Sequence, residues 1–223
     1  MNGEINWGIF MLKNTERQLA LDLTDVIHFF HRKNWSPATS TNYSIRENSS
    51  ERILISSSGI DKGLFKAEDL MLIDLSGKKI DQNDARKTSA ETDIHLFLYQ
   101  AFPSINCVLH THSPLGTLLS RDFEKEKKIS FEGWEILKGL QGNLTHDMTE
   151  ILPIVSNSQD MKKIIHDYQQ LMSARDHGFL ISGHGLYSWG SNLSEAKRHI
   201  ETIEFLFELL HLSRGRYGHF KTT

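Results

Sequence analysis

Four stretches of the chain place apolar residues three and four positions apart, a spacing that gathers them on one face of an α-helix. They are residues 15–32, 88–101, 158–173 and 192–215. The first begins with Thr15 and Gln18, and the last begins with Asn192 and Glu195, pairs that can form capping boxes at a helix start. The pattern therefore predicts four amphipathic helices that pack on a common core.

Short apolar runs bounded by Gly, Ser, Asn or Pro predict β-strands. They are residues 53–56, 70–75, 106–111 and 178–189, the last interrupted at 183–185. The Ser-, Thr- and Asn-rich stretch 35–50 indicates a loop and a short strand. Strands and helices interleave without repeats or an evident linker, so residues 1–223 are expected to form one α/β domain of the layered α+β kind, around a mostly antiparallel sheet.

The composition of the 223 residues, with 39% hydrophobic and 24% charged, is that of a globular protein. The formal net charge is -3 and the basic residues are dispersed, so the sequence predicts no basic patch for binding nucleic acid. No apolar run approaches the roughly 18 residues of a membrane span, and residues 1–14 do not resemble a secretory signal. The single cysteine, Cys107, fits a reducing compartment. We expect a cytoplasmic protein with a small-molecule partner, and neither nucleic acid nor a membrane.

His110 and His112 lie two residues apart in an apolar, strand-like segment. Side chains at such positions point to the same face of a strand. Two neighbouring imidazoles are costly to bury unless their lone pairs are satisfied, and a divalent metal does this well. The pattern is short, however, and leaves a metal site and ordinary polar histidines equally open.

His184 lies between Gly183 and Gly185, and the glycines allow backbone and ligand to come close. Taken alone, this tripeptide is typical of a tight turn with a surface histidine. Combined with the paired histidines it supplies a third ligand. Three protein ligands leave one coordination position open, which is the arrangement of a catalytic zinc site.

Two acids lie near these elements in the sequence. Glu91 ends the sequence Thr88-Ser89-Ala90-Glu91, so it either caps a helix or serves the site. Glu135 lies in a Gly-Trp-Glu-Ile-Leu-Lys segment, where a lone acid is typical of a solvated position.

The loops at 39–42 and 57–62 are rich in hydroxyls, amides and glycine, and the second also carries Lys62. Loops of this kind can donate several hydrogen bonds to a phosphate, with a lysine adding charge. Ordinary turn chemistry explains the same residues equally well.

In order and spacing, these motifs together resemble the class II aldolase/adducin family along nearly the whole chain. The likeness rests on residues 39–44, Ser58-Gly59 with Lys62, residues 88–91, residues 108–112 and Gly183-His184-Gly185. Three further segments, 135–140, 151–157 and 184–190, favour a dehydratase branch of the family.

The resemblance implies a central antiparallel sheet flanked by helices and a cyclic homotetramer with sites at subunit boundaries. It implies one Zn2+ per subunit, bound by His110, His112 and His184. The implied phosphate-binding residues are Asn42, Ser58, Gly59, Lys62 and Ser89. The chain departs from the family pattern at Thr41, where many aldolases have glycine, and at Ala90, where they often have serine.

The reaction implied for this branch is dehydration of a 2-keto sugar phosphate, in which the C3 proton leaves before the C4 hydroxyl. Zinc would act as a Lewis acid on the charge that develops. By resemblance, Glu135 is the acid/base that moves the C3 proton and assists departure of the hydroxyl. Glu91 matches the catalytic acid of the aldolases and is the second candidate.

Two alternatives remain open from the sequence. An aldolase or epimerase of the same family would use the same metal but break or remake a carbon bond. An adducin-like binding module would keep the fold without catalysis, although it would have no chemical need for the three histidines and both acids.

Overall fold

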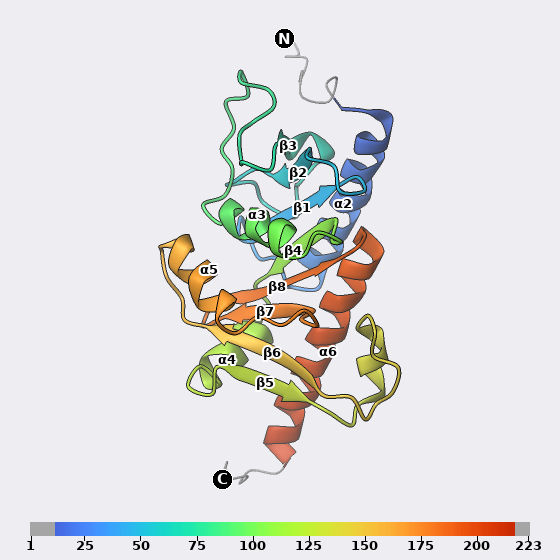
Figure 1. Ribbon diagram of the computed structural model, residues 1–223, viewed down its shortest axis with the longest axis vertical. Helices are drawn as coiled ribbons and strands as arrows, with labels where there is room; N and C mark the ends of the chain where they lie inside the picture. The colour runs from blue at the N-terminus through green and yellow to red at the C-terminus, as the bar shows by residue number, and fades with distance from the viewer. Residues whose placement is uncertain (1–11, 217–223) are drawn as a thin grey trace.

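The computed structural model describes residues 12–216, which form a single eight-stranded sheet with helices on both faces (Figure 1). The strands are β1 (Tyr43–Arg46), β2 (Ile53–Ser56), β3 (Leu70–Ile73), β4 (Cys107–Thr111), β5 (Lys128–Phe131), β6 (Glu150–Val155), β7 (Gly178–Ile181) and β8 (Gly185–Gly190). The helices are α2 (Asn14–Arg32), α3 (Thr92–Ala101), α4 (Pro114–Asp122), α5 (Met161–Gln169) and α6 (Leu193–Arg216), with short 3-10 turns η1 (Ala67–Asp69) and η2 (Glu135–Gly139).

The strand order across the sheet is β3-β2-β1-β4-β8-β7-β6-β5. Neighbouring strands are antiparallel except β6 and β7, which are parallel. This confirms the predicted α+β architecture with a mostly antiparallel sheet. The central strands β4 and β8 are buried along their whole length, so the candidate histidine of β4 lies in the middle of the molecule.

Alternate residues of the strands face two separate hydrophobic clusters. Leu109 of β4 packs with α2, α4 and α6 on one face of the sheet, whereas Val108 packs with α3 and α5 on the other face. Figure 1 shows α3 and α5 on the opposite side of the strands from α6. Because both faces are covered, a one-residue shift of β4 would exchange the contents of the two clusters, and the register is therefore strongly specified.

The start of α2 differs from the prediction. The carboxylate of Glu16 accepts a hydrogen bond from the Lys13 backbone N–H at 2.8 Å, so the helix begins at Asn14. The predicted pair makes other contacts, because Thr15 donates to Glu47 and Gln18 donates to Asp22. The capping prediction for Thr15 and Gln18 was therefore wrong, although the helix itself is confirmed.

The start of α6 agrees with the prediction. The side-chain oxygen of Asn192 accepts from the Glu195 backbone N–H at 2.9 Å, and the Glu195 carboxylate accepts from the Ser191 N–H at 2.6 Å. These bonds satisfy amide donors that have no partner within the helix.

Three other elements are shorter in the structure than the sequence predicted. The helix predicted over 88–101 begins at Thr92, because Thr88 instead forms a β-bridge with Ser57. The strand predicted over 70–75 ends at Ile73, where Asp74 starts a turn closed by the Gly77 N–H. The helix predicted over 158–173 is limited to Met161–Gln169.

Within residues 12–216, no helix has both the length and the apolar composition that crossing a bilayer requires. Residues 1–11, on which the prediction about the N-terminal segment mainly depended, lie outside the part of the chain that is described, as do residues 217–223.

The close approach of β8 to β4 generates a testable prediction. A Cβ on Gly185 would lie 2.1 Å from the Thr111 carbonyl oxygen, a backbone atom that cannot move without separating the strands. Gly185→Ala should therefore lower the free energy of unfolding by about 3 kcal/mol, as measured by denaturant titration.

The matched control is Gly133→Ala. Gly133 has a φ of +75°, and nothing lies within 4 Å of the position that an added methyl group would take, so its substitution adds backbone strain without a clash. That strain should cost about 1 kcal/mol. Equal losses in the two variants would contradict the steric account of Gly185.

Candidate metal centre

The three candidate metal ligands come from two neighbouring segments. His110 lies on β4, and His112 follows the end of that strand. His184 lies in the turn between β7 and β8, where its N–H donates to the Ile181 carbonyl at 3.0 Å and Gly183 has a φ of +62°. Because β8 pairs with β4, this turn lies beside the end of β4. The pairing therefore brings His184 to the two histidines.

Each of the three histidines offers one ring nitrogen, and these nitrogens all lie within 4.8 Å of one another. The Nε2 atoms of His110 and His112 are 2.7 Å apart. His110 is fully buried, whereas His112 and His184 are half-buried. The cluster thus has one ligand in the core and two with access to solvent.

The protonation states that the surroundings favour suit a divalent cation. Nδ1 of His110 lies 2.9 Å from the Leu186 carbonyl, an acceptor, so the proton belongs on Nδ1 and the Nε2 lone pair is free. Burial lowers the pKa of His112 to about 4, which keeps it neutral at pH 7. Burial also lowers the pKa of His110.

The polar atoms left without partners provide a test of fit for the metal that the family implies. Nε2 of His110 carries a free lone pair and lies 2.7 Å from Nε2 of His112, so a cation held by both rings would satisfy the two nitrogens together. Nδ1 of His184 is buried and has no hydrogen-bond partner. Three imidazole nitrogens are a donor set that zinc accepts, so the residues fit this metal.

The carboxylate of Glu91 lies against the histidines. Its Oε1 is 3.1 Å from Nε2 of His184, and its Oε2 is 3.5 Å from Nε2 of His110. Glu91 occupies the N-cap position of α3 but its side chain makes no capping bond. Of the two roles left open by the sequence, contact with the site is the one that the geometry supports.

The charge state of Glu91 is set by opposing effects. Burial raises the pKa of this carboxyl, but attraction to the imidazoles of His110 and His184 and a hydrogen bond from Tyr187 lower it well below its usual range. The Tyr187 hydroxyl donates to Oε2 at 2.8 Å. Glu91 is therefore an anion beside the candidate ligands.

Sequence reasoning missed Tyr187 and His95. The Tyr187 ring stacks on His110 with centroids 3.9 Å apart, and His95 contacts the side-chain oxygen of Asn42 through its Nε2. The register that places Tyr187 opposite His110 exists only once β4 and β8 pair. No local signal in the sequence marks it.

Three adjoining loops carry the residues expected to bind phosphate. The Ser58 N–H donates to the Lys87 carbonyl at 2.8 Å, and the Lys62 N–H donates to the Ala38 carbonyl at 2.9 Å. These bonds join the 57–62 loop to the 87–91 segment and to the 38–42 loop. Asn42 connects the group to the metal centre, because its side chain contacts Glu91.

Asn42 and Ser89 are engaged within the protein. The Asn42 amide donates to Glu91 at 2.5 Å and to the Ser89 hydroxyl at 3.4 Å. The Ser89 hydroxyl also accepts from the Glu91 N–H at 3.2 Å. In this arrangement, both side chains orient Glu91.

Ser58 and Gly59 are exposed, and Gly59 has a φ of +82° with open space around it. The neighbouring Ser57 hydroxyl is buried and has no hydrogen-bond partner, so it is an additional phosphate-binding candidate. Lys62 is almost fully buried, and its Nζ donates to the Ile60 carbonyl at 3.0 Å. Burial lowers the pKa of Lys62 to about 8, so the amine is charged at pH 7 only by a modest margin.

The contacts that Glu135 makes are with residues outside the histidine cluster. Its side chain is 71% exposed and pairs with Lys138 at 2.5 Å and with His146 at 3.7 Å. The hydrogen bond to Lys138 lowers the pKa of Glu135. The single chain therefore does not bring Glu135 to the three histidines.

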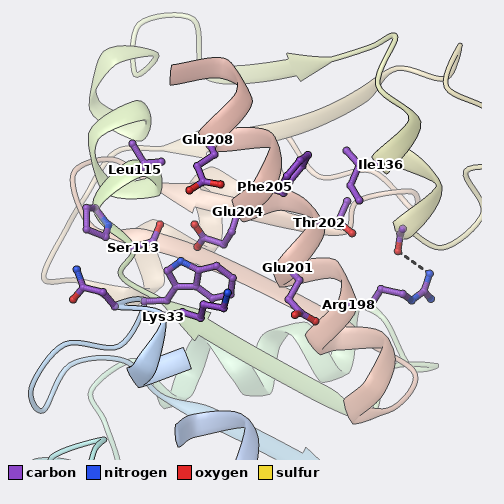
Figure 2. Close-up of a pocket in the computed structure, with 14 residues that line it drawn as sticks. Lys33, Ser113, Leu115, Ile136, Arg198, Glu201, Thr202, Glu204, Phe205 and Glu208 are labelled. Atoms are coloured by element: carbon purple, nitrogen blue, oxygen red, sulfur yellow. Dashed lines mark hydrogen bonds between the residues drawn. The ribbon is translucent and has the colours of Figure 1, made fainter. Parts of the chain in front are cut away.

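A cavity of about 720 Å³ lies between η2, α6 and the start of α4, and none of the three histidines lines it (Figure 2). Its wall includes Glu204, which is buried and accepts from the Thr111 hydroxyl at 3.1 Å. Burial raises the pKa of Glu204 to about 7. Since Thr111 lies between His110 and His112 in the chain, the cavity is on the opposite face of that strand from the metal centre.

Comparison with known families agrees with this architecture. Residues 21–211 match the family described as "Class II Aldolase and Adducin N-terminal domain". The chain belongs to the class II aldolase/adducin family, as the resemblance in the sequence indicated.

Relatives named methylthioribulose-1-phosphate dehydratase include proteins from Picosynechococcus sp. and Stenotrophomonas maltophilia. The protein from Picosynechococcus sp. is 45% identical over 187 residues, covering 83% of this chain and 88% of the relative. The protein from Stenotrophomonas maltophilia is 41% identical over 191 residues, covering 85% of this chain and 88% of the relative.

Solved structures share the fold at lower identity. L-fuculose-1-phosphate aldolase from Thermus thermophilus has a TM-score of 0.73 at 19% identity, covering 92% of this chain and 100% of that chain. A sugar-phosphate aldolase from Thermotoga maritima has a TM-score of 0.65 at 18% identity, covering 94% of this chain and 100% of that chain.

The geometry predicts about one zinc per chain in purified protein. His110→Ala and His112→Ala should lose it, because two imidazoles rarely retain zinc, and metal analysis by mass spectrometry checks this. His166→Ala is the control, since His166 is an exposed histidine on α5. Full occupancy in both site variants would refute the assignment.

Proposed function

We propose that this protein is a zinc-dependent lyase that dehydrates 5-methylthioribulose 1-phosphate to 2,3-diketo-5-methylthiopentyl 1-phosphate in methionine salvage. The observation that carries the proposal is the cluster of His110, His112 and His184, with Glu91 beside it, in a chain 40–45% identical to relatives named as this dehydratase. A three-histidine set leaves a coordination position for substrate.

A bound zinc would supply Lewis-acid stabilisation of the negative charge that develops when the C3 proton of a 2-keto sugar phosphate is removed. The chain supplies the remaining functions. Glu91 stays ionised against the imidazoles, and Tyr187 and Asn42 hold its carboxylate in place. The 57–62 loop offers the exposed Ser58, whose hydroxyl can donate to a phosphate, and Gly59, which has open space around it for a ligand.

Glu135 is the proposed acid/base, which takes the C3 proton and then assists departure of the C4 hydroxyl. An exposed carboxylate can do this only if another surface covers it, because water competes for its lone pairs. We therefore propose a cytoplasmic homotetramer in which Glu135 of one subunit reaches the metal centre of a neighbour. The exposed Trp134 and Ile136 beside it support this arrangement.

The direct test is incubation of metal-replete protein with 5-methylthioribulose 1-phosphate while the diketone product is measured. Glu135→Gln should lower kcat by about 10²- to 10⁴-fold, because the amide keeps the shape but has no basic lone pair. Zinc content should be unchanged. Cleavage of fuculose 1-phosphate without diketone formation would instead identify an aldolase.

Glu91→Gln is the comparison that separates the two acids. Exchange of the C3 proton with deuterated solvent reports the base step by itself. If Glu135→Gln exchanges this proton at the wild-type rate and Glu91→Gln does not, then Glu91 is the base.

Subunit mixing tests where Glu135 acts. Co-expressed His110→Ala and Glu135→Gln subunits are each inactive alone, but a site shared between neighbours would recover about a quarter of wild-type activity in random mixtures. A site built within one chain would recover none. Light scattering of the same mixture gives the number of subunits.

Phosphate recognition by the 57–62 loop is the second testable part of the proposal. Ser58→Ala should raise KM by several-fold, on the order of 1 kcal/mol of lost hydrogen bonding, while kcat stays close to wild type. Such a split identifies a contact that is equal in the ground and transition states. Because Ser57 is buried without a partner, Ser57→Ala is the companion variant; unchanged KM in both would place the phosphate elsewhere.

A further inference from the structure

Two buried histidines hold the backbone of one residue, Gln141, which lies just beyond η2. Nε2 of His177 lies 2.8 Å from the Gln141 carbonyl oxygen, and the Gln141 N–H donates to Nε2 of His199 at 3.1 Å. The two imidazoles meet edge to face with centroids 4.9 Å apart. His177 precedes β7 and His199 belongs to α6, so elements distant in the sequence fix both backbone polar groups of one residue.

The partners of each ring decide its protonation. His177 faces acceptors on both sides, because its Nδ1 lies 2.9 Å from the Glu150 carboxylate and its Nε2 faces the Gln141 carbonyl. Only the doubly protonated imidazolium can donate to both. His199 faces the Trp189 carbonyl through Nδ1 and an N–H donor through Nε2, so its neutral form satisfies both contacts.

Other contacts also hold the segment between Glu135 and Gln141 against the rest of the protein. A Cβ on Gly139 would lie 2.2 Å from the Thr202 hydroxyl, so only glycine allows η2 to lie this close to α6. Arg198 donates to the Gly139 carbonyl at 2.7 Å, and Figure 2 shows Thr202 of α6 beside Ile136. Leu137 and Leu140 are buried in the core.

The result is an exposed side chain on a fixed backbone. Glu135 is 71% exposed, yet the segment that carries it is held by the core, by α6 and by the two histidines. A carboxylate that must reach a reacting proton requires such a base, because a displacement of about 1 Å can cost on the order of 10²-fold in rate.

We propose that His177, as an imidazolium paired with Glu150, and neutral His199 form a clamp on Gln141 that positions Glu135 for catalysis. This inference rests on the proposed role of Glu135. His177 and His199 are positioning residues, since neither contacts the metal centre or the exposed carboxylate.

The charged groups around the clamp set its pH dependence. Glu150 on β6 and Asp176 before β7 face His177, while Glu195 and Arg198 act on His199. Burial opposes the charge on His177, but the hydrogen bond and attraction from Glu150 outweigh it and raise the pKa of His177 above its ordinary 6.5. Burial lowers the pKa of His199 to about 4, so it stays neutral.

The sign of the effect follows from the raised pKa of His177. The stabilisation is fully present below the ordinary histidine pKa and is lost as the pH rises through the folded value. Above that value, one of the two contacts of His177 sets lone pair against lone pair, and the clamp opens on the alkaline side.

The experiment compares His177→Gln with His166→Gln, a control that changes an exposed histidine on α5 in the same chemical way. Hydrogen exchange of the peptide spanning 134–143, measured by mass spectrometry with correction for intrinsic rates, reports the clamp without any need for activity. Exchange in the wild type should also increase as the pH rises through the raised pKa of His177, and Glu150→Gln should move that increase to lower pH.

His177→Gln should exchange faster over 134–143 and lower kcat roughly 10- to 100-fold, while KM, zinc content and the remaining peptides match the control. Unchanged exchange in His177→Gln overturns the clamp. Faster exchange with wild-type kcat overturns its positioning role. If His177→Gln does not fold, the wild-type and Glu150→Gln exchange profiles decide, and profiles without a pH-dependent increase overturn the proposal.

Failure of the proposed function has a different signature. If the wild type does not turn over the substrate, or if Glu135→Gln stays fully active, the exchange measurements still establish whether the clamp exists. In that case the clamp holds η2 but has no catalytic carboxylate to position.

Discussion

The antiparallel pairing of β4 with β8 is the constraint on which the candidate site depends. This pairing puts His110 opposite Tyr187 and brings the turn that carries His184 to the end of β4. Gly185 permits it, because any side chain there would collide with the Thr111 carbonyl. The sheet then buries His110 fully, which keeps its imidazole neutral and able to bind a metal. Packing, protonation and ligand geometry are thus consequences of a single strand pair.

Polar side chains around this strand pair form a continuous chain of contacts. Glu91 contacts His110 and His184, Tyr187 and Asn42 hold Glu91, and His95 holds Asn42. Each group satisfies the one before it, so an anion can be buried without the full cost of desolvation. A network of this kind fixes the ligands before a metal arrives, which lowers the reorganisation that binding requires.

Glu135 lies on η2, which is held by other contacts than the metal centre. The metal centre is built by β4, the β7–β8 turn and the start of α3. The η2 segment is held by α6 at Gly139 and by His177 and His199 at Gln141. The metal centre and η2 present their functional groups to different surroundings. Such a separation is what the proposed site, completed by a neighbouring subunit, would require.

The sequence by itself determined the elements whose signals are local. The helical spacing in 15–32 and 192–215, the Asn192 and Glu195 pair, the histidine alternation at 110 and 112, and the glycines around His184 all express interactions over a few residues. Tertiary structure alone decided that Tyr187 lies on His110, that Glu91 faces the candidate metal ligands rather than capping α3, and that Gln141 lies between His177 and His199. The physical reason is range: spacing along the chain fixes which face a side chain takes, but its partner across the sheet depends on register and packing.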